Sequence, residues 1–409
     1  MIANGIVIAV LLGAAALLFA PRTQRSTDWQ ATVTPLASII GSGFLVSVPL
    51  LARQVGDWAL PAMAVLVGAA WLVGAAIRFN IRHVEPLLGE PPKDGETRLA
   101  LSLEKLSHFV LAFAYFVSVA YYLVLLGNFL LKGLGVVDPA AAKAIATVIL
   151  ATLGALGLLK GLGMVERIEK YSVGLNLAVI AGLIAGLLWR NGDLLASGAW
   201  QLPGDTPPLG LHSLQVLLGL LIVVQGFETS RFLGDEFDAE TRIRTMRRAQ
   251  LIAAAVYLAF FALTTSLFGL LGSDRGIAAI VGLVGHVALV LPLLLTVGAV
   301  ASQFSASVAD SVGCAGLLED IAARRLSLRH AYPLIALVAV AITWGTDVFR
   351  LVTLASQAFA LFYLVQACVA LAVAWDDRGL PSRTRHLLLF AGGAAFCLSV
   401  VLFGVPAEG

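Results

Sequence analysis

Ionisable and polar side chains interrupt a long apolar stretch at residues 211–236. Gln225, Glu228 and Arg231 lie where the centre of a membrane-spanning helix is expected. An ionisable side chain at that depth costs about 2.5–3.5 kcal/mol even on lenient insertion scales, so it indicates a functional site. A helix that ends before Glu228 is the alternative, but the apolar run before it is too short to cross a bilayer alone. Glu228 and Arg231 are three residues apart on one helical face and could partly neutralise each other.

A run of small residues lies at the centre of an earlier apolar segment. Gly41, Ser42 and Gly43 are consecutive, and Pro35 and Pro49 flank them. Because glycine has no Cβ and proline weakens a helix, unwinding would cost little there. Peptide groups freed inside a membrane need a polar partner, and a bound solute is one such partner. Close helix packing through small residues is the alternative interpretation.

A third polar patch lies near residue 305. Ser302, Ser305, Ser307 and Asp310 could supply oxygen ligands to a cation such as sodium. Serine hydroxyls often bond back to their own helix, so the carboxyl group is the stronger signal. Asp310 could bind a cation, carry a proton, pair with Arg231 or lie near the cytoplasmic mouth.

The overall composition makes polar side chains within the apolar runs unusual. Of the 409 residues, 59% are hydrophobic and 13% are charged, a balance that indicates apolar surface facing lipid. The formal net charge of +2 does not favour a nucleic-acid partner. Three cysteines without CxxC spacing argue against a disulfide framework or a zinc site, so we expect no cofactor and no resident metal.

Twelve apolar runs are candidates for transmembrane helices. They cover residues 2–20, 31–52, 58–79, 106–131, 139–158, 171–189, 211–236, 249–271, 286–314, 331–346, 349–374 and 386–404. Together they predict an all-α membrane protein with one transmembrane domain over residues 1–409.

The spacing of the first two polar clusters divides this domain into two units. Residues 31–190 and 211–374 each hold five candidate helices, and an odd number inverts the second unit relative to the first. The first helix of each unit carries one cluster, as expected for two interrupted helices that meet at the bilayer midplane. Residues 2–20 and 386–404 are then extra helices at the two ends.

The distribution of charge predicts an orientation. Most of the 27 Lys and Arg residues fall on alternate connections, beginning with the one after residues 2–20. Because basic residues favour cytoplasmic loops, both termini are expected outside, in an inner or plasma membrane of bacterial type.

Two motifs resemble a known family. The stretches IIGSGFL at residue 39 and QGFE at residue 225 are similar to the paired motifs of the amino acid, polyamine and organocation (APC) transporter superfamily. The resemblance covers residues 31–374 and includes the acidic pair Asp235 and Glu236. It implies the leucine-transporter fold, an inverted five-helix repeat. The Asn-Pro turn that usually follows the sixth helix in that family is missing here.

The resemblance also implies a solute site on the backbones of two unwound segments. The corresponding residues are Ile40, Gly41, Ser42, Gly43, Gln225, Gly226 and Phe227. Phe227 would resemble the gate, and Glu228 matches an acidic residue that several proton-coupled members use. Asn176 occupies the site where some proton-coupled relatives have a lysine. Aromatic candidates for lining the cavity are Tyr115, Tyr121, Tyr122 and Tyr363, although such residues more often pack.

These observations predict a secondary active transporter of an amino acid or related small solute. Transport would occur by alternating access, driven by a proton or sodium gradient or by exchange. An organic amine or inorganic cation, attracted by Glu228 and Asp310, is the alternative cargo. A membrane enzyme is disfavoured because the six histidines make no catalytic or metal-binding spacing. A sensor would be expected to carry a signalling domain.

Overall fold

The computed structural model describes the whole chain except residues 89–94, 205–206, 273, 275, 324 and 408–409, and excludes the side chains of residues 42, 95–97 and 163–170. The described part is helical and contains no strand. Its longer helices are α1 (Ile2–Leu18), α3 (Thr27–Val55), α4 (Ala59–His83), α5 (Gly95–Gly133), α6 (Pro139–Lys160), α7 (Gly163–Ala196), α9 (Ala239–Thr264), α11 (Leu291–Ile321), α12 (Leu328–Gly345), α13 (Val348–Asp376) and α14 (Arg383–Phe403). The shorter ones are α2 (Pro21–Gln24), η1 (Gly56–Trp58), η2 (Glu85–Leu87), α8 (Leu211–Leu218), η3 (Leu221–Val224), η4 (Phe227–Leu233), η5 (Thr265–Leu271) and α10 (Ile280–Gly285).

Side-chain caps fix where several long helices begin. Ser26 accepts a hydrogen bond from the backbone of the third residue after it, at the start of α3. Asp138, Asp238 and Asp347 accept backbone hydrogen bonds in the same way at the starts of α6, α9 and α13. A capping oxygen satisfies an amide that has no partner inside the helix, so these four polar residues define helix starts that hydropathy alone leaves vague.

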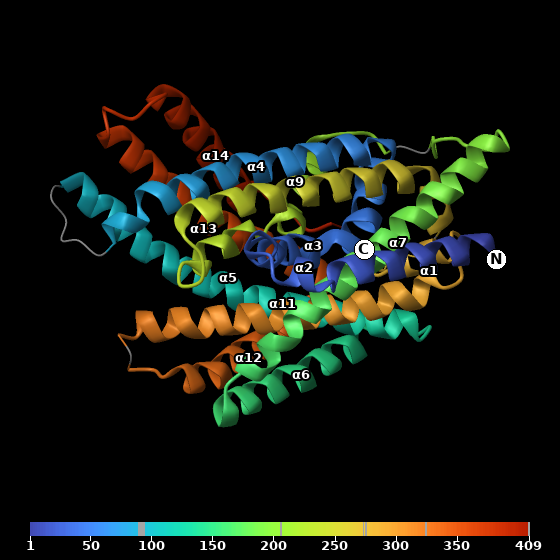
Figure 1. Ribbon diagram of the computed structural model, residues 1–409, viewed down its shortest axis with the longest axis horizontal. Coiled ribbons are helices and arrows are strands. Elements are labelled where there is room, and N and C mark those ends of the chain that lie inside the picture. The colour runs from blue at the N-terminus through green and yellow to red at the C-terminus, as the bar shows by residue number, and fades with distance from the viewer. Residues whose placement is uncertain (89–94, 205–206, 273, 275, 324, 408–409) are drawn as a thin grey trace.

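The helices run roughly along the longest axis of the molecule (Figure 1). The connections after α4, α11 and α13 lie at the left end of that view, and the N-terminus and the connection between α7 and α8 lie at the right. This arrangement agrees with the predicted alternation of basic and non-basic connections. The orientation of these ends relative to the cytoplasm stays a prediction.

Nine segments of the described residues are long and apolar enough to cross a membrane. The prediction of twelve crossings differs from this number for three reasons. Helix α1 has only 17 residues, α3 and α4 form one continuous run, and the segment from α8 to η4 is interrupted. The twelve crossings, the inverted repeat and the single-domain boundaries stay predictions.

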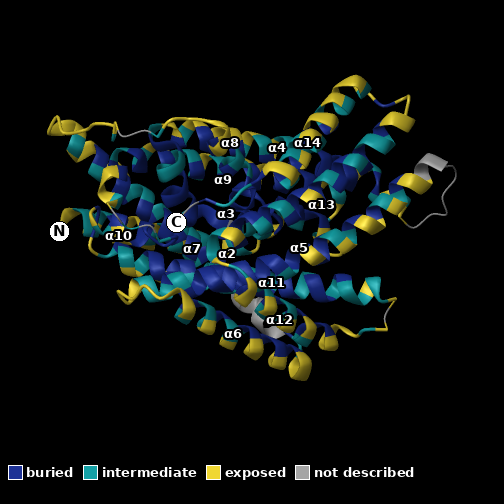
Figure 2. Cartoon of the chain, turned by 180° about the vertical axis from the view of Figure 1, so that it is seen from behind, coloured by how far each residue is buried: buried dark blue, intermediate teal, exposed yellow. Residues whose placement is uncertain are grey.

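The core is built on α5, which packs against α11 and α13. Buried residues concentrate on these central helices, and exposed residues concentrate on α6, α12 and α14 (Figure 2). Many of the exposed side chains are large and apolar, such as Val148, Leu337 and Leu388. An apolar outer surface around a buried polar interior suits contact with lipid.

The prediction of unwinding at residues 41–43 is wrong, because α3 is helical from Thr27 to Val55. The two glycines provide close packing instead. A Cβ on Gly43 would lie 2.6 Å from the backbone of Val223, and a Cβ on Gly41 would lie 3.0 Å from the Ser302 hydroxyl. The small residues therefore let the interrupted sixth segment and α11 approach α3.

Asp274 joins three segments at the end of the molecule where α3 and α5 finish. Its carboxylate lies 2.5 Å from the Lys132 ammonium, and its carbonyl accepts a hydrogen bond from Arg53. Partial burial raises the pKa of Asp274, but hydrogen bonds from Lys132 and the Gly276 amide outweigh it, so the pKa lies below its ordinary value. The carboxylate therefore stays ionised, and the contact between the ends of α3 and α5 is held by charge.

Gly43→Ala is expected to destabilise the protein, because the new methyl group would collide with the backbone of η3. Overpacking of this kind costs about 1–3 kcal/mol. The measurement is thermal unfolding of the purified protein in detergent. Gly68→Ala in α4, where a Cβ would meet nothing within 4 Å, is the matched control and should not lower the midpoint. Equal midpoints for the two variants would contradict this packing role.

Candidate functional site

The sixth segment is interrupted where the sequence predicted it. Helix α8 stops at Leu218, and after η3 the chain extends through Gln225 to Gly226, whose φ of 117° is in the left-handed region. A side chain at Gly226 would be strained, and its Cβ would lie 2.4 Å from the Ser38 hydroxyl. Glycine is therefore required both for the turn and for the approach of α3.

Side chains satisfy the peptide groups that this interruption frees. The Glu228 carboxyl accepts a hydrogen bond from the Gly226 amide, 3.0 Å away, and another from the Tyr363 hydroxyl. Tyr257 donates to the carbonyl of Val223, and Ser356 accepts from the amide of Ile222. The amide of Gly226, which the resemblance assigns to the solute, is thus occupied by Glu228.

Two tyrosines flank the side chain of Gln225. Its amide nitrogen lies 3.4 Å from the Tyr122 hydroxyl, and its amide oxygen lies 3.2 Å from the Tyr363 hydroxyl. The rings of Phe227 and Tyr363 stack with centroids 5.0 Å apart. All of these side chains are buried, so the predicted residues of the sixth segment form a closed polar cluster against α5 and α13.

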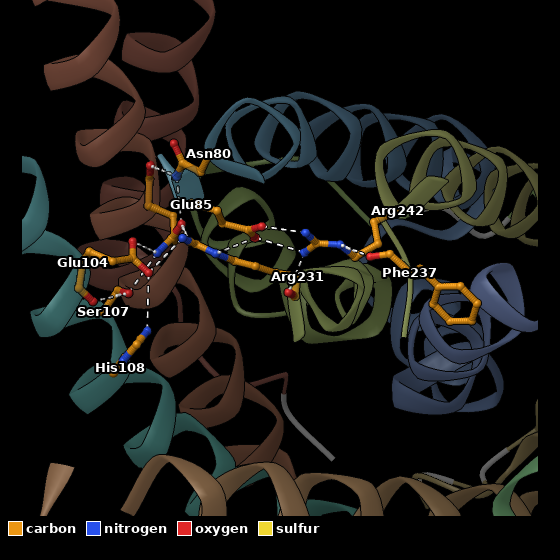
Figure 3. A network of polar contacts seen from close by, with 9 residues as sticks. Asn80, Glu85, Glu104, Ser107, His108, Arg231, Phe237 and Arg242 are labelled. Atoms are coloured by element: carbon orange, nitrogen blue, oxygen red, sulfur yellow. Dashed lines mark hydrogen bonds and ion pairs between the residues drawn. The ribbon is translucent and has the colours of Figure 1, made fainter. Parts of the chain in front are cut away.

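The side chains of η4 that follow Phe227 face in different directions. Because a 3₁₀-helix has three residues per turn, Glu228 and Arg231 lie on one face, and Thr229 and Phe232 lie on another. The Arg231 guanidinium lies 2.9 Å from the Glu104 carboxylate (Figure 3). Arg231 therefore neutralises a carboxylate of α5, and the hypotheses that it pairs with Glu228 or Asp310 are wrong.

The other face of η4 borders a vestibule of about 820 Å³. Helices α2, α3, α5, α7 and α11 supply the rest of its walls. Its lining includes Gln24, Gln30, Thr34, Tyr115, Tyr171, Thr229, Phe232, Glu236 and Asp310. Among the described lining residues, Glu236 and Asp310 carry the only charged side chains. The described part of its lining is therefore acidic, and the space is large enough for a small solute.

A smaller cavity of about 40 Å³ shares the wall at Asp310 and reaches between α3, α7 and α11. Several predicted residues line it: Ile40, Asn176, Ser302, Ser305 and Asp310. The Asn176 amide donates to the Ser302 hydroxyl over 3.2 Å, and Ser118 donates to Asp310. The volume exceeds the roughly 10–15 Å³ that one water needs, and the lining oxygens suit a hard cation.

Other predicted residues lie apart from this cavity. The Ser307 hydroxyl bonds back to the Phe304 carbonyl of its own helix, 2.7 Å away, and is not among the lining residues. The carbonyl of Gly41 accepts a hydrogen bond from Gln303. The Ser42 side chain lies outside the described residues. The described part of the chain has no group of three His, Cys, Asp or Glu residues that could hold a metal ion.

Of the remaining residues of the site, the sequence suggested two tyrosines and missed Ser118 and Glu104. Tyr122 and Tyr363 were candidates for the cavity wall, and both contact Gln225. Ser118 was missed because a serine in an apolar run gives no distinguishing signal. Glu104 was missed because it lies just before the apolar run at 106–131, whereas α5 begins at Gly95 and buries it.

Comparisons with known proteins agree with this geometry. The sequence profile of a family described as APC superfamily transporter matches residues 21–404. An uncharacterized protein of Aquifex aeolicus (strain VF5) is 39% identical over 396 residues, which cover 96% of this chain and 95% of that protein.

One solved structure shows the same fold at low sequence identity, and another is similar to most of the chain. The first is the substrate-bound outward-open state of a Na⁺-coupled sialic acid symporter, with a TM-score of 0.54, 15% identity and coverage of 98% of this chain and 99% of that chain. Mhp1, a nucleobase-cation-symport-1 family transporter with bromovinylhydantoin bound, has a TM-score of 0.48, 14% identity and coverage of 91% and 90%. The fold is that of the leucine transporter, and the chain is an integral membrane protein that belongs to the APC superfamily of transporters.

Proposed function

We propose that this secondary active transporter moves a small solute that carries a positively charged amino group, with Asp310 as its partner. The observation that supports the proposal is the acidic vestibule that ends at Asp310. A charge-assisted hydrogen bond to a buried carboxylate would hold an ammonium group there. Of the cargoes considered from the sequence, an amino acid and an organic amine carry such a group, whereas an inorganic cation does not.

A second observation favours the amine over the amino acid. An amino acid would also need donors for its carboxylate, and the Gly226 amide is one donor that the resemblance assigns to this role. Glu228 occupies that amide at 3.0 Å. A carboxylate solute would have to displace this side chain, whereas an amine would not. Amino acids remain the second candidate, because a rotation of Glu228 would expose the amide.

Glu228 is the proposed coupling site for a proton. Tyr363 has one hydroxyl proton but lies within hydrogen-bond distance of both Gln225 and Glu228. A proton on the Glu228 carboxyl would let both contacts form. It would also remove the cost of a buried charge whose described contacts are neutral groups. Proton binding and release at Glu228 would then bias the position of η4.

Sodium is the second candidate for coupling, and the small cavity supports it. Hydroxyl, amide and carboxylate oxygens from α3, α7 and α11 surround the space at Asp310. These are ligands that hard cations take. The symporter with a similar fold is Na⁺-coupled, which makes sodium a reasonable ion to test. In the predicted orientation, with both termini outside, the vestibule would face the cytoplasm of a bacterial-type inner membrane.

Asp310→Asn is expected to reduce uptake of amines by proteoliposomes about tenfold or more, because a charged hydrogen bond contributes roughly 1.5–3 kcal/mol. Radiolabelled methylamine, putrescine and alanine are the probes, each with unlabelled competitors. Ser307→Ala, whose hydroxyl bonds to its own helix, is the control. Uptake of an uncharged or anionic solute alone would contradict the proposal.

Glu228→Gln is expected to abolish the response of uptake to an imposed proton gradient, because the amide cannot titrate. Exchange of labelled for unlabelled solute should continue, since exchange needs no net proton movement. Both rates are measured in the same proteoliposomes. If a proton gradient still drives uptake by the variant, Glu228 is not the coupling site.

Ser305→Ala tests sodium coupling, with Ser307→Ala as its matched control on the same helix. If sodium binds in the small cavity, loss of one hydroxyl ligand should raise the sodium concentration needed for half-maximal uptake about tenfold. The control should leave it unchanged, because Ser307 is not among the lining residues. If uptake does not depend on sodium in the parent or in either variant, sodium is not the coupling ion.

A further inference from the structure

The face of η4 turned away from the vestibule makes a polar contact with α13. Glu228 and Arg231 are three residues apart on η4, and Tyr363 and Gln366 are three residues apart on α13. Tyr363 donates to Glu228, and Arg231 donates to Gln366. The two helices therefore meet through two stacked pairs, one at Glu228 and one at Arg231.

Further contacts join the second pair to a buried network (Figure 3). The Gln366 amide nitrogen donates to Glu104 over 3.0 Å and to Ser107 over 2.9 Å, both on α5. Asn80 of α4 donates to Gln366 over 2.8 Å. Because Arg231 also pairs with Glu104 over 2.9 Å, the network ties η4 to α5 and α13 together.

The backbone of η4 is held on its other side. Arg242, at the start of α9, donates to the Arg231 carbonyl over 2.8 Å and pairs with Glu85 over 2.6 Å. Its Nε donates to the Phe237 carbonyl over 3.1 Å. Arg242 thus binds one carbonyl within η4 and one in the connection that follows it. The position of η4 thus depends on side chains from other helices.

We propose that Arg231 is a positioning residue for Glu228. It holds η4 against α13 through Gln366 and against α5 through Glu104, and so keeps the Glu228 carboxyl on the Tyr363 hydroxyl and out of water. This inference rests on the proposed role of Glu228 as the proton site. It adds that the proton affinity of Glu228 is set from one helical turn away, by a contact that touches neither solute nor proton.

The groups around Glu228 separate this role from a direct effect of charge. Tyr363 faces it from α13, Tyr115 and Tyr122 from α5 are within electrostatic reach, and these two tyrosines also lie near Asp310 of α11. The charged side chain of η4 nearest to Glu228 is Arg231, and the Glu104 carboxylate balances its positive charge. If the positive charge of Arg231 acted directly on Glu228, its removal would favour the protonated Glu228 carboxyl. If Arg231 acts by holding η4 in position, its removal lets water reach Glu228 and favours the ionised carboxylate.

The experiment is an infrared pH titration of the purified full-length protein, with the proton as the only ligand. The carbonyl stretch of a protonated Glu228 is identified as the band missing in Glu228→Gln. The test variant combines Arg231→Met with Glu104→Gln, which removes the ion pair without leaving one buried charge unpaired. The matched control combines Arg82→Met with Glu240→Gln, removing an exposed pair at 2.6 Å.

We expect the pH of half-titration to fall by about one unit in the test variant, a tenfold loss of proton affinity. The control pair should not move it. A test variant that titrates like the parent, or at higher pH, overturns the positioning role. If the parent itself shows no band that depends on Glu228, the proposed proton site fails, and this inference fails with it. If the parent shows a band that depends on Glu228, and the half-titration pH of that band is the same in the test variant, only this inference is overturned.

A second variant covers the case in which the double variant does not fold. Gln366→Leu leaves the Arg231–Glu104 ion pair in place but removes the contact between Arg231 and α13. It should lower the half-titration pH in the same direction, by a smaller amount. An unchanged titration in a folded Gln366→Leu protein would also contradict the proposal. Size-exclusion chromatography and thermal unfolding establish which variants are folded.

Discussion

Peptide groups inside a membrane protein must find hydrogen-bond partners within the protein, and the interrupted sixth segment depends on this constraint. Between Leu218 and η4 the chain has no regular α-helical ladder. Side chains from two other helices replace it: Ser356 from α13, and Tyr257 and Arg242 from α9. Glu228 satisfies the Gly226 amide from within the segment itself. The interrupted segment is therefore a set of backbone groups whose hydrogen-bond partners are side chains of this protein.

The two ends of the molecule are organised differently around this segment. The vestibule opens beside the starts of α3 and α7, and Asp310 forms its inner wall. At the ends of α3 and α5, Asp274 holds Lys132 and Arg53 together. Lys132 is 17 residues beyond Tyr115 of the vestibule wall, or about 25 Å along α5. One end thus carries a charged cluster that joins α3 to α5, while the other end holds the vestibule.

The sequence predicted the fold class and the interruption at Gln225–Glu228 because charges inside an apolar run leave few alternatives. It did not predict the continuity of α3. Glycines at 41 and 43 serve unwinding or close packing equally well, and the choice between them depends on the packing of η3 and α11 against α3. The Arg231–Glu104 pair could not be predicted from the sequence either, because its members are 127 positions apart and Glu104 lies just before a predicted helix. Residues on one helix can be related by their spacing, whereas partners on different helices depend on tertiary packing.

The 3₁₀ winding of η4 has a mechanical consequence. A 3₁₀-helix rises about 0.5 Å more per residue than an α-helix, so rewinding the seven residues of η4 into α geometry would shorten it by roughly 3–4 Å. The same change in pitch would turn Glu228 and Arg231 about 60° apart around the helix axis. A screw motion of this size would release one side chain from α13 while the other stayed attached. The sixth segment could in this way convert a change in bonding at a single carboxyl group into a rotation and a contraction.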